Sequence, residues 1–166
     1  STIAGIDRPS FATRRATVSI GQYCNRHVIT TGKSTEIDEV ARLMRQHHVG
    51  TVVVVEQRDD AEFPIGIVTD RDLVVEVLAQ NLPPDVVTVG DVMSNDLLTA
   101  REDDNFWHTL DRMSAKGVRR LLVVDEKGVL AGILAVEDVL TALAVGLSDV
   151  TRLVQRGIAR EVRQRQ

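Results

Sequence analysis

An internal repeat constrains the fold of this 166-residue chain more than any other feature of its sequence. The stretch GIVTDRDL at 66–73 returns at 132–139 as GILAVEDV, an offset of 66 residues. Upstream, apolar residues of the two copies correspond with an offset of 69: Ile37, Ala41 and Met44 match Phe106, Leu110 and Met113. The offset changes at a polar turn that is longer in the first copy, and such insertions are typical of surface turns. The spacing therefore predicts two copies of one structural unit.

Each copy has the pattern of a short strand, a helix, two strands and a second helix. Apolar residues in the first helix of copy one share a helical face: Ile37, Val40, Ala41 and Met44. The aliphatic runs 52–55 and 121–124 are too short for helices and are predicted to be buried strands. Because a unit of about 60 residues buries little surface alone, we predict an α+β fold of two βαββα units. Their sheets should pack together around a pseudo-twofold axis.

These patterns divide the chain into a leader at 1–20, a first unit at 21–82, a second unit at 88–146 and a C-terminal helix at 147–166. Pro83 and Pro84 separate the units, because neither can continue a helix. The C-terminal segment places apolar residues every fourth position, with arginines on another face: Val150, Val154, Ile158 and Val162 against Arg152, Arg156, Arg160 and Arg163. We expect this helix, weakened at Gly157, to dock on its own unit or on a dimer partner. Contact with an acidic surface or a membrane is the alternative.

Composition narrows the class of protein. Hydrophobic residues make up 43% and charged residues 27%, as in an ordinary globular domain. The net charge of −4 gives no electrostatic argument for nucleic-acid binding. A single cysteine, Cys24, excludes an internal disulfide and suits a reducing compartment. No apolar run is long enough to span a bilayer. A cytoplasmic protein is the expectation.

Three motifs together resemble the cystathionine-beta-synthase (CBS) domain family, whose members occur as tandem pairs called Bateman modules. The first motif, at 66–72, is a glycine followed by two aliphatic residues, a threonine, two variable residues and an aspartate. The second is Asp-Val-Met-Ser at 91–94. The third, at 117–125, is Gly-Val-Arg-Arg followed by a predicted strand. The resemblance covers about 21–145. It implies small mixed sheets packed by helices and a homodimer. It also implies regulatory binding of adenosine-containing ligands (AMP, ADP, ATP, NAD or S-adenosylmethionine) in clefts between the units.

The residues of the first phrase suit a phosphorylated ligand. The segment from Thr69 to Asp72, which includes Asp70, lies between a strand that ends at Val68 and a helix that begins near Leu73. At the start of a helix, free N–H groups and the helix dipole favour an anion. The Thr69 hydroxyl can donate to an oxygen of the ligand, and Arg71 can add a charge-assisted contact. Asp72 only accepts hydrogen bonds, as the two hydroxyls of a ribose require. The alternative is that Thr69 or Asp70 merely caps the helix; within the repeat we favour the ligand.

The second copy lacks two of these groups. Ala135 stands at the position of Thr69, Glu137 replaces Arg71, and only the aspartate remains, as Asp138. At an effective dielectric constant of about 20, like charges 4 Å apart repel by roughly 4 kcal/mol. We therefore predict one competent nucleotide site per chain, and a second site that is degenerate, empty or limited to ribose contacts by Asp138.

The resemblance implies further members of the pocket. In the family the adenine lies against the first short strand of a unit, here 28–31 and its match 97–99, which proposes Ile29, Thr30, Thr31 and Thr99. Arg119 and Arg120 resemble basic residues that reach a phosphate, although strand alternation allows only one to point inward. Solvated surface charge or a dimer ion pair is the alternative for both arginines. In the first unit Gly50 and Thr51 are small enough for a ligand to approach the backbone.

The preferred interpretation is a nucleotide-sensing module that signals through dimer shape or an unknown effector protein. The alternative is a structural dimerisation module with a vestigial pocket. We expect neither catalysis nor a metal site. His47 and His48 diverge by about 100° on a helix, and nothing nearby orients Cys24 and His27 as nucleophile and base. The run Gly-Lys-Ser at 32–34 lacks the first glycine of a P-loop.

Overall fold

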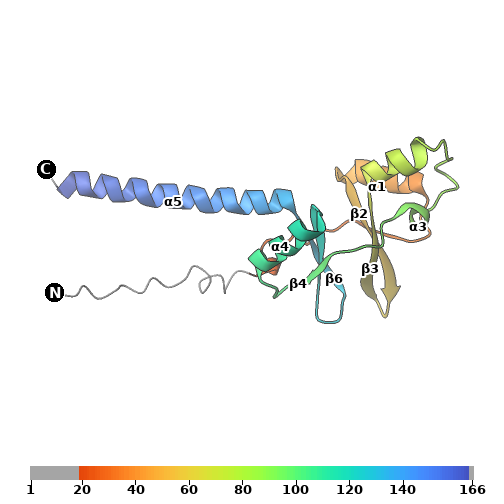
Figure 1. Ribbon diagram of the computed structural model, residues 1–166, viewed down its shortest axis with the longest axis horizontal. Helices are drawn as coiled ribbons and strands as arrows, with labels where there is room; N and C mark the ends of the chain where they lie inside the picture. The colour runs from red at the N-terminus through yellow and green to blue at the C-terminus, as the bar shows by residue number, and fades with distance from the viewer. Residues whose placement is uncertain (1–18, 165–166) are drawn as a thin grey trace.

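A computed structural model describes residues 19–164, with the side chains of 157–164 excluded (Figure 1). The sequence predictions for 1–18 lie outside the described residues. The first unit contains β1 (Thr30–Gly32), α1 (Ile37–His47), β2 (Thr51–Arg58), β3 (Ala61–Thr69), α2 (Asp70–Asp72) and a π-helix, η3 (Leu73–Leu78). The second contains β4 (Thr99–Arg101), α4 (Phe106–Lys116), β5 (Arg120–Val124), β6 (Leu130–Ala135) and α5 (Val136–Gln164). The predicted order of strand, helix, strand, strand, helix is confirmed in both units.

Both units form three-stranded sheets of the same topology. In each, the first strand pairs in parallel with the second, and the second pairs antiparallel with the third, in the orders β1-β2-β3 and β4-β5-β6. The register is also repeated, since Thr51 faces Thr69 in one sheet and Arg120 faces Ala135 in the other. The first strands begin at Thr30 and Thr99, each two residues later than the sequence pattern predicted.

Three apolar clusters form the core. One lies within each unit, between the helices and one face of the sheet. The third joins the two sheets through Val53, Val55 and Leu122, so the predicted packing of sheet against sheet is confirmed. The prediction that Ala41 faces the core is wrong: its side chain is exposed. Its equivalent Leu110, which has a longer side chain, packs against the second core.

The two units exchange their leading segments. The segment before β1 starts with η2 (Ile20–Gln22) and packs on the second unit, where Ile20 is fully buried and Asn25 pairs with Ile133 of β6. The segment before β4 starts with α3 (Val89–Val92) and packs on the first unit, where Val89 is fully buried. The assignment of Ile20 to a leader was therefore wrong, because this residue completes the core of the second unit.

Close approach of these leading segments explains why the repeated phrase begins with glycine. A Cβ atom on Gly66 would lie 2.4 Å from Met93 Sδ. A Cβ atom on Gly132 would lie 2.9 Å from both Cys24 Sγ and the backbone oxygen of Asn25. Both distances are below normal contact, so only glycine lets the leading segment cross the third strand of each sheet.

The last helix differs from the prediction. Instead of a separate C-terminal helix from 147, α5 runs unbroken from Val136 to Gln164 through Gly146 and Gly157. Figure 1 shows α5, in blue, extending away from both units. Every residue from 143 to 156 is exposed, so this part of the helix does not dock on its own unit as expected. Within residues 19–164, no helix has the length and hydropathy needed to cross a membrane.

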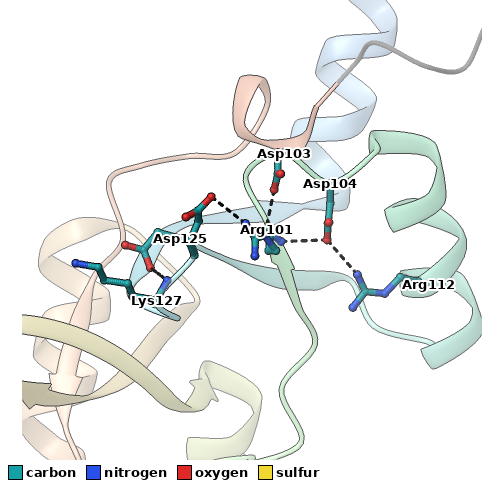
Figure 2. Close-up of polar contacts among 7 residues, drawn as sticks. Arg101, Asp103, Asp104, Arg112, Asp125 and Lys127 are labelled. Carbon is teal, nitrogen blue, oxygen red and sulfur yellow. Dashed lines mark hydrogen bonds and ion pairs between the residues drawn. The ribbon is translucent and has the colours of Figure 1, made fainter.

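Ion pairs close the end of the second sheet where β4 leads into α4 (Figure 2). Arg101 forms ion pairs with Asp103 and Glu126, both at 3.2 Å. Arg112 pairs with Asp104 and donates a hydrogen bond to the backbone oxygen of Thr99 at 2.7 Å. These contacts fix β4 and therefore have a structural role.

Candidate functional site

Two cavities of nearly equal size lie where the units meet. The first, which we call the Thr69 pocket, has a volume of about 300 Å³. It is lined by Ile67, Thr69, Ser94, Asp96, Leu97, Leu98, Gly117, Val118, Arg119, Arg120, Leu121 and Leu122. The second, the Ala135 pocket, has a volume of about 290 Å³. It is lined by Asn25, His27, Val28, Ile29, His48, Val49, Gly50, Thr51, Val53, Arg120, Ile133, Ala135, Glu137 and Asp138.

The two pockets are related by the internal repeat. Applying the offsets of 69 and 66 to the sequence converts most of one lining into the other, so that Thr69 corresponds to Ala135 and Gly50 to Arg119. Each pocket joins the repeated phrase of one unit to the leading segment of the other, as the exchange of segments requires. This exchange was not predicted from the sequence: Thr69 lines a pocket with Leu97 and Leu98, whereas Ile29 lines a pocket with Ala135.

Thr69 and Asp72 form a complete capping box at the start of α2. The Asp72 carboxylate accepts hydrogen bonds from the Thr69 backbone N–H at 2.8 Å and from the Thr69 hydroxyl at 2.7 Å. The Asp72 N–H in turn donates to the Thr69 hydroxyl oxygen at 3.3 Å. The capping alternative is thus present in the structure. A ligand at Thr69 can still use the second lone pair of the hydroxyl oxygen.

Asp70 and Arg71 belong to the first phrase but lie outside both pocket linings. The Asp70 N–H donates to the backbone oxygen of Gly50 at 3.1 Å, and its carboxylate accepts from the Arg71 N–H at 2.8 Å. A Cβ atom on Gly50 would lie 3.0 Å from Asp70 Oδ2, so the glycine makes room for this carboxylate. The Arg71 side chain is exposed.

The second phrase, at 132–139, retains one hydrogen bond of the capping box and has an ion pair that the first phrase, at 66–73, lacks. Asp138 accepts a hydrogen bond from the Ala135 N–H at 3.0 Å, but no hydroxyl is available to complete the box. Glu137 pairs with Arg119, which lines the Thr69 pocket. The hydrogen bond from its own backbone N–H, followed by the contact with Arg119, lowers the pKa of Glu137 below its ordinary value of 4.5.

This shift predicts a pH-dependent contribution to stability. A carboxylate whose pKa is lower in the folded state stabilises the fold above pH 4.5, its ordinary pKa, and loses that effect as the pH falls through the lowered value. Glu137→Gln should therefore reduce the free energy of unfolding at pH 7 by no more than about 1 kcal/mol, because the pair is exposed. In urea titrations the difference should shrink as the pH is lowered below 4.5, and it should also shrink in about 1 M salt. A difference that stays equal as the pH is lowered would contradict this cause.

Some of the remaining predicted residues line a pocket, and others make only structural hydrogen bonds. Gly50, Thr51 and Asp138 line the Ala135 pocket, and Arg120 lines both pockets. Both Arg119 and Arg120 line the Thr69 pocket. The Arg119 side chain pairs with Glu137, and the expectation that only one of the two arginines points into the pocket stays a prediction. Three threonines lie outside both linings and make structural hydrogen bonds. The Thr30 hydroxyl donates to Glu62, the Thr31 hydroxyl donates to Thr35, and the Thr99 backbone oxygen accepts from Arg112.

Several lining residues were not predicted from the sequence. These are Asn25, His27, Val28, His48, Val49, Val53 and Ile133 in one pocket, and Ile67, Ser94, Asp96, Leu97, Leu98, Gly117, Val118, Leu121 and Leu122 in the other. A signal for some of them was present. The offset of 69 extends upstream to Ile20 and Val89, which pairs 25–29 with 94–98.

Charge distinguishes the pockets. The Thr69 pocket holds Arg119 and Arg120 against one carboxylate, Asp96, which is itself paired with Lys116. The Ala135 pocket holds Arg120 and two carboxylates: Glu137, which is paired with Arg119 of the Thr69 pocket, and Asp138, which accepts from the Ala135 N–H. The Thr69 pocket is therefore lined by more cations than carboxylates, and the Ala135 pocket by more carboxylates than cations.

Comparison with known proteins identifies the repeated unit. The family model for the CBS domain matches the chain twice, at residues 20–79 and 89–145. The chain belongs to the CBS domain family. The first CBS match begins at the buried Ile20, in agreement with the boundary that the structure sets.

CBS relatives extend over most of the chain. An uncharacterized protein of Methanopyrus kandleri is 42% identical over 123 residues, which is 74% of this chain and 61% of the relative. The chain thus spans about three fifths of that relative's length. An uncharacterized conserved protein of Pyrococcus horikoshii has a similar crystal structure, with a TM-score of 0.67 and 28% identity over 76% of this chain and 92% of that one. A CBS domain pair crystallised with 5′-methylthioadenosine and S-adenosyl-L-methionine gives a TM-score of 0.66 and 25% identity, covering 78% and 98%.

Proposed function

We propose that this chain is a regulatory CBS pair that binds an adenosine-containing nucleotide between its two units, with the phosphate in the Thr69 pocket. The observation that carries the proposal is the lining of that pocket, where Arg119 and Arg120 adjoin an apolar surface. Planar guanidinium groups bind phosphate oxygens through paired hydrogen bonds. A flat apolar base fits between aliphatic side chains such as Leu97 and Leu98. The relative crystallised with two adenosine compounds, neither of which carries a phosphate, supports the adenosine part of the ligand.

This proposal relocates the phosphate contacts that the sequence suggested. Arg71 and Asp72 were expected to hold the ligand, but neither lines a pocket. Arg119 and Arg120 take over the cationic role from the opposite unit. Thr69 remains in the site as a hydroxyl whose proton is already committed to Asp72, so it accepts from the ligand instead of donating to it.

The Ala135 pocket is proposed to be the weaker site for phosphorylated ligands. Its two carboxylates oppose a phosphate, while Asp138 retains an acceptor for ribose hydroxyls. Binding in the Thr69 pocket would draw Arg119 away from Glu137. Since these two residues belong to different pockets, ligand in one pocket would change the charge of the other. This exchange of partners is a route by which binding could reach the rest of the module and an effector protein.

A structural module with a vestigial pocket is the second candidate. It is favoured by the capping box, because Thr69 and Asp72 already satisfy each other. It is also favoured by the exposed apolar residues of η3, which suit an interface: Val74, Val75 and Leu78. Ligand binding separates the two candidates.

Isothermal titration calorimetry with AMP, and with adenosine as the control that lacks phosphate, tests the proposal. We expect one AMP site per chain and clearly weaker binding of adenosine. In thermal unfolding, AMP at about 100 times its dissociation constant should add roughly 2.7 kcal/mol to the free energy of unfolding. Two equal AMP sites per chain would contradict the inequality of the pockets. No heat and no thermal shift with AMP, ATP, NAD or S-adenosylmethionine would favour the structural module.

A further inference from the structure

The free part of α5 has no packing partner within residues 19–156. Its side chains are exposed throughout 143–156, including large apolar ones: Leu143, Val145, Leu147, Val150, Leu153 and Val154. Leu153 is 73% exposed and Leu147 is 69% exposed. At 1.5 Å per residue, this helix of 29 residues is about 44 Å long. Most helices in water owe their stability to packing of an apolar face, so a covering partner is expected.

The apolar residues follow the spacing of a helix-pairing seam. Leu140, Leu143, Leu147, Val150 and Val154 alternate steps of three and four residues. This period of 3.5 residues keeps one face of each helix turned toward a neighbouring helix. The residues beside the seam are small or apolar, such as Ala144, Gly146 and Thr151. A Cβ atom on Gly146 would meet nothing within 4 Å, so this side of the helix is open to a close neighbour.

The charges of α5 indicate which neighbour fits. The first half carries only acidic residues, Glu137, Asp138 and Asp149, whereas Arg152 and Arg156 begin a basic segment. Arg152 contacts Asp149 at 3.6 Å, but its side chain stays 71% exposed, so it remains open to other contacts. Two copies of α5 in antiparallel orientation place the basic segment of each beside the acidic segment of the other. A parallel pair would instead bring the arginines of both copies together.

We propose that two copies of this chain pair through α5 as an antiparallel helical interface. The occupant of the apolar seam is thus the same seam of a second copy. In an antiparallel pair, the seam of the second helix runs in reverse order, so that its three-residue and four-residue steps can lie beside steps of the same length in the first. This register places Leu143 of one copy opposite Val154 of the other, and Leu147 opposite Val150. The interface is built by the helix beyond the second unit and does not depend on ligand in either pocket.

Disulfide trapping tests both the pairing and its direction. In a Cys24→Ser background, the double variant Leu143→Cys with Val154→Cys should oxidise to a covalent dimer, seen as the main species on a non-reducing gel. Each single variant should stay uncrosslinked, because it lacks the cysteine opposite. The two positions of one helix are about 16 Å apart, too far for a disulfide within a chain. Single variants that crosslink with themselves would overturn the antiparallel direction. Failure of all three would overturn the interface.

A charge substitution provides a second measurement. Leu147→Glu places a carboxylate in the seam and should shift the mass measured by sedimentation equilibrium toward that of the monomer, by at least tenfold in dimer dissociation constant. Ser148→Glu adds the same charge on the outer face of the same turn and is the matched control, expected to behave as the wild type. Equal behaviour of the two variants would contradict the seam. Circular dichroism confirms that both variants retain their folded units.

Discussion

Arg120→Ala is expected to weaken AMP binding by about 10- to 100-fold, which corresponds to the loss of one charge-assisted contact to phosphate. Among the described residues only Arg120 lines both the Thr69 pocket and the Ala135 pocket, so its loss removes a cation from each. Arg120 lies at the start of β5 and pairs with Ala135 of β6. Its backbone takes part in this strand pairing, which does not depend on the side chain. The fold should therefore survive, and calorimetry will report the change in affinity directly.

The matched controls are Arg42→Ala and the phosphate-free ligand. Arg42 pairs with Asp38 on the surface of α1, outside both pockets, and its loss should leave AMP affinity unchanged. Adenosine should bind the wild type and Arg120→Ala about equally, because the arginine acts on the phosphate. If Arg120→Ala bound AMP as tightly as the wild type, the phosphate would not lie between the arginines. If adenosine affinity fell as much as AMP affinity, Arg120 would act on the nucleoside.

Ile20→Ala should lower the free energy of unfolding by about 2–5 kcal/mol, the usual cost of removing a large aliphatic side chain from a core. Ile20 is completely buried against α4 and β6 of the second unit, although the chain reaches it before the first unit begins. For a domain of this size the loss corresponds to a fall in Tm of roughly 5–15 °C. Urea titration followed by circular dichroism measures the free energy directly.

Two further variants serve as comparisons for Ile20→Ala. Val89→Ala removes the equivalent residue, fully buried in the first unit, and should also destabilise the protein. Val86→Ala, at a position that is 68% exposed, should change the free energy by less than about 0.5 kcal/mol. A loss below that value for Ile20→Ala would mean that the leading segment contributes nothing to the second core.

The repeat made the fold predictable. The apolar spacing of 37–44 and 106–113 indicated the helices, and the short aliphatic runs at 52–55 and 121–124 indicated the central strands. These helices and strands are indicated by patterns within a few neighbouring residues, and their burial follows from the apolar residue types in them. The leading segments were assigned to the units that follow them along the chain, because 20–25 contains little periodic apolar pattern and nothing in its own sequence says which sheet it will cross.

The site was predictable in its chemistry and less so in its assembly. The change from Thr69 to Ala135 and from Arg71 to Glu137 indicated two unequal clefts, and the charges of the two pockets agree in direction with that prediction. The choice of Arg71 as the phosphate contact relied on distance along the chain. In the structure the cationic groups of the Thr69 pocket are Arg119 and Arg120 of the other unit, which the resemblance to the CBS family had already suggested.

The amino-acid sequence by itself determined two βαββα units, their apolar cores and the chemical difference between the two phrases, because periodicity and residue type act within a few turns of chain. Only the tertiary structure decided that each leading segment crosses to the opposite sheet, that Arg119 and Arg120 line the same pocket as Thr69, and that α5 runs unbroken beyond the second unit. Those outcomes depend on which surfaces meet when both units are folded. Contacts between Ile20 and α4, or Arg119 and Glu137, form across long stretches of chain and are selected by packing of the whole molecule.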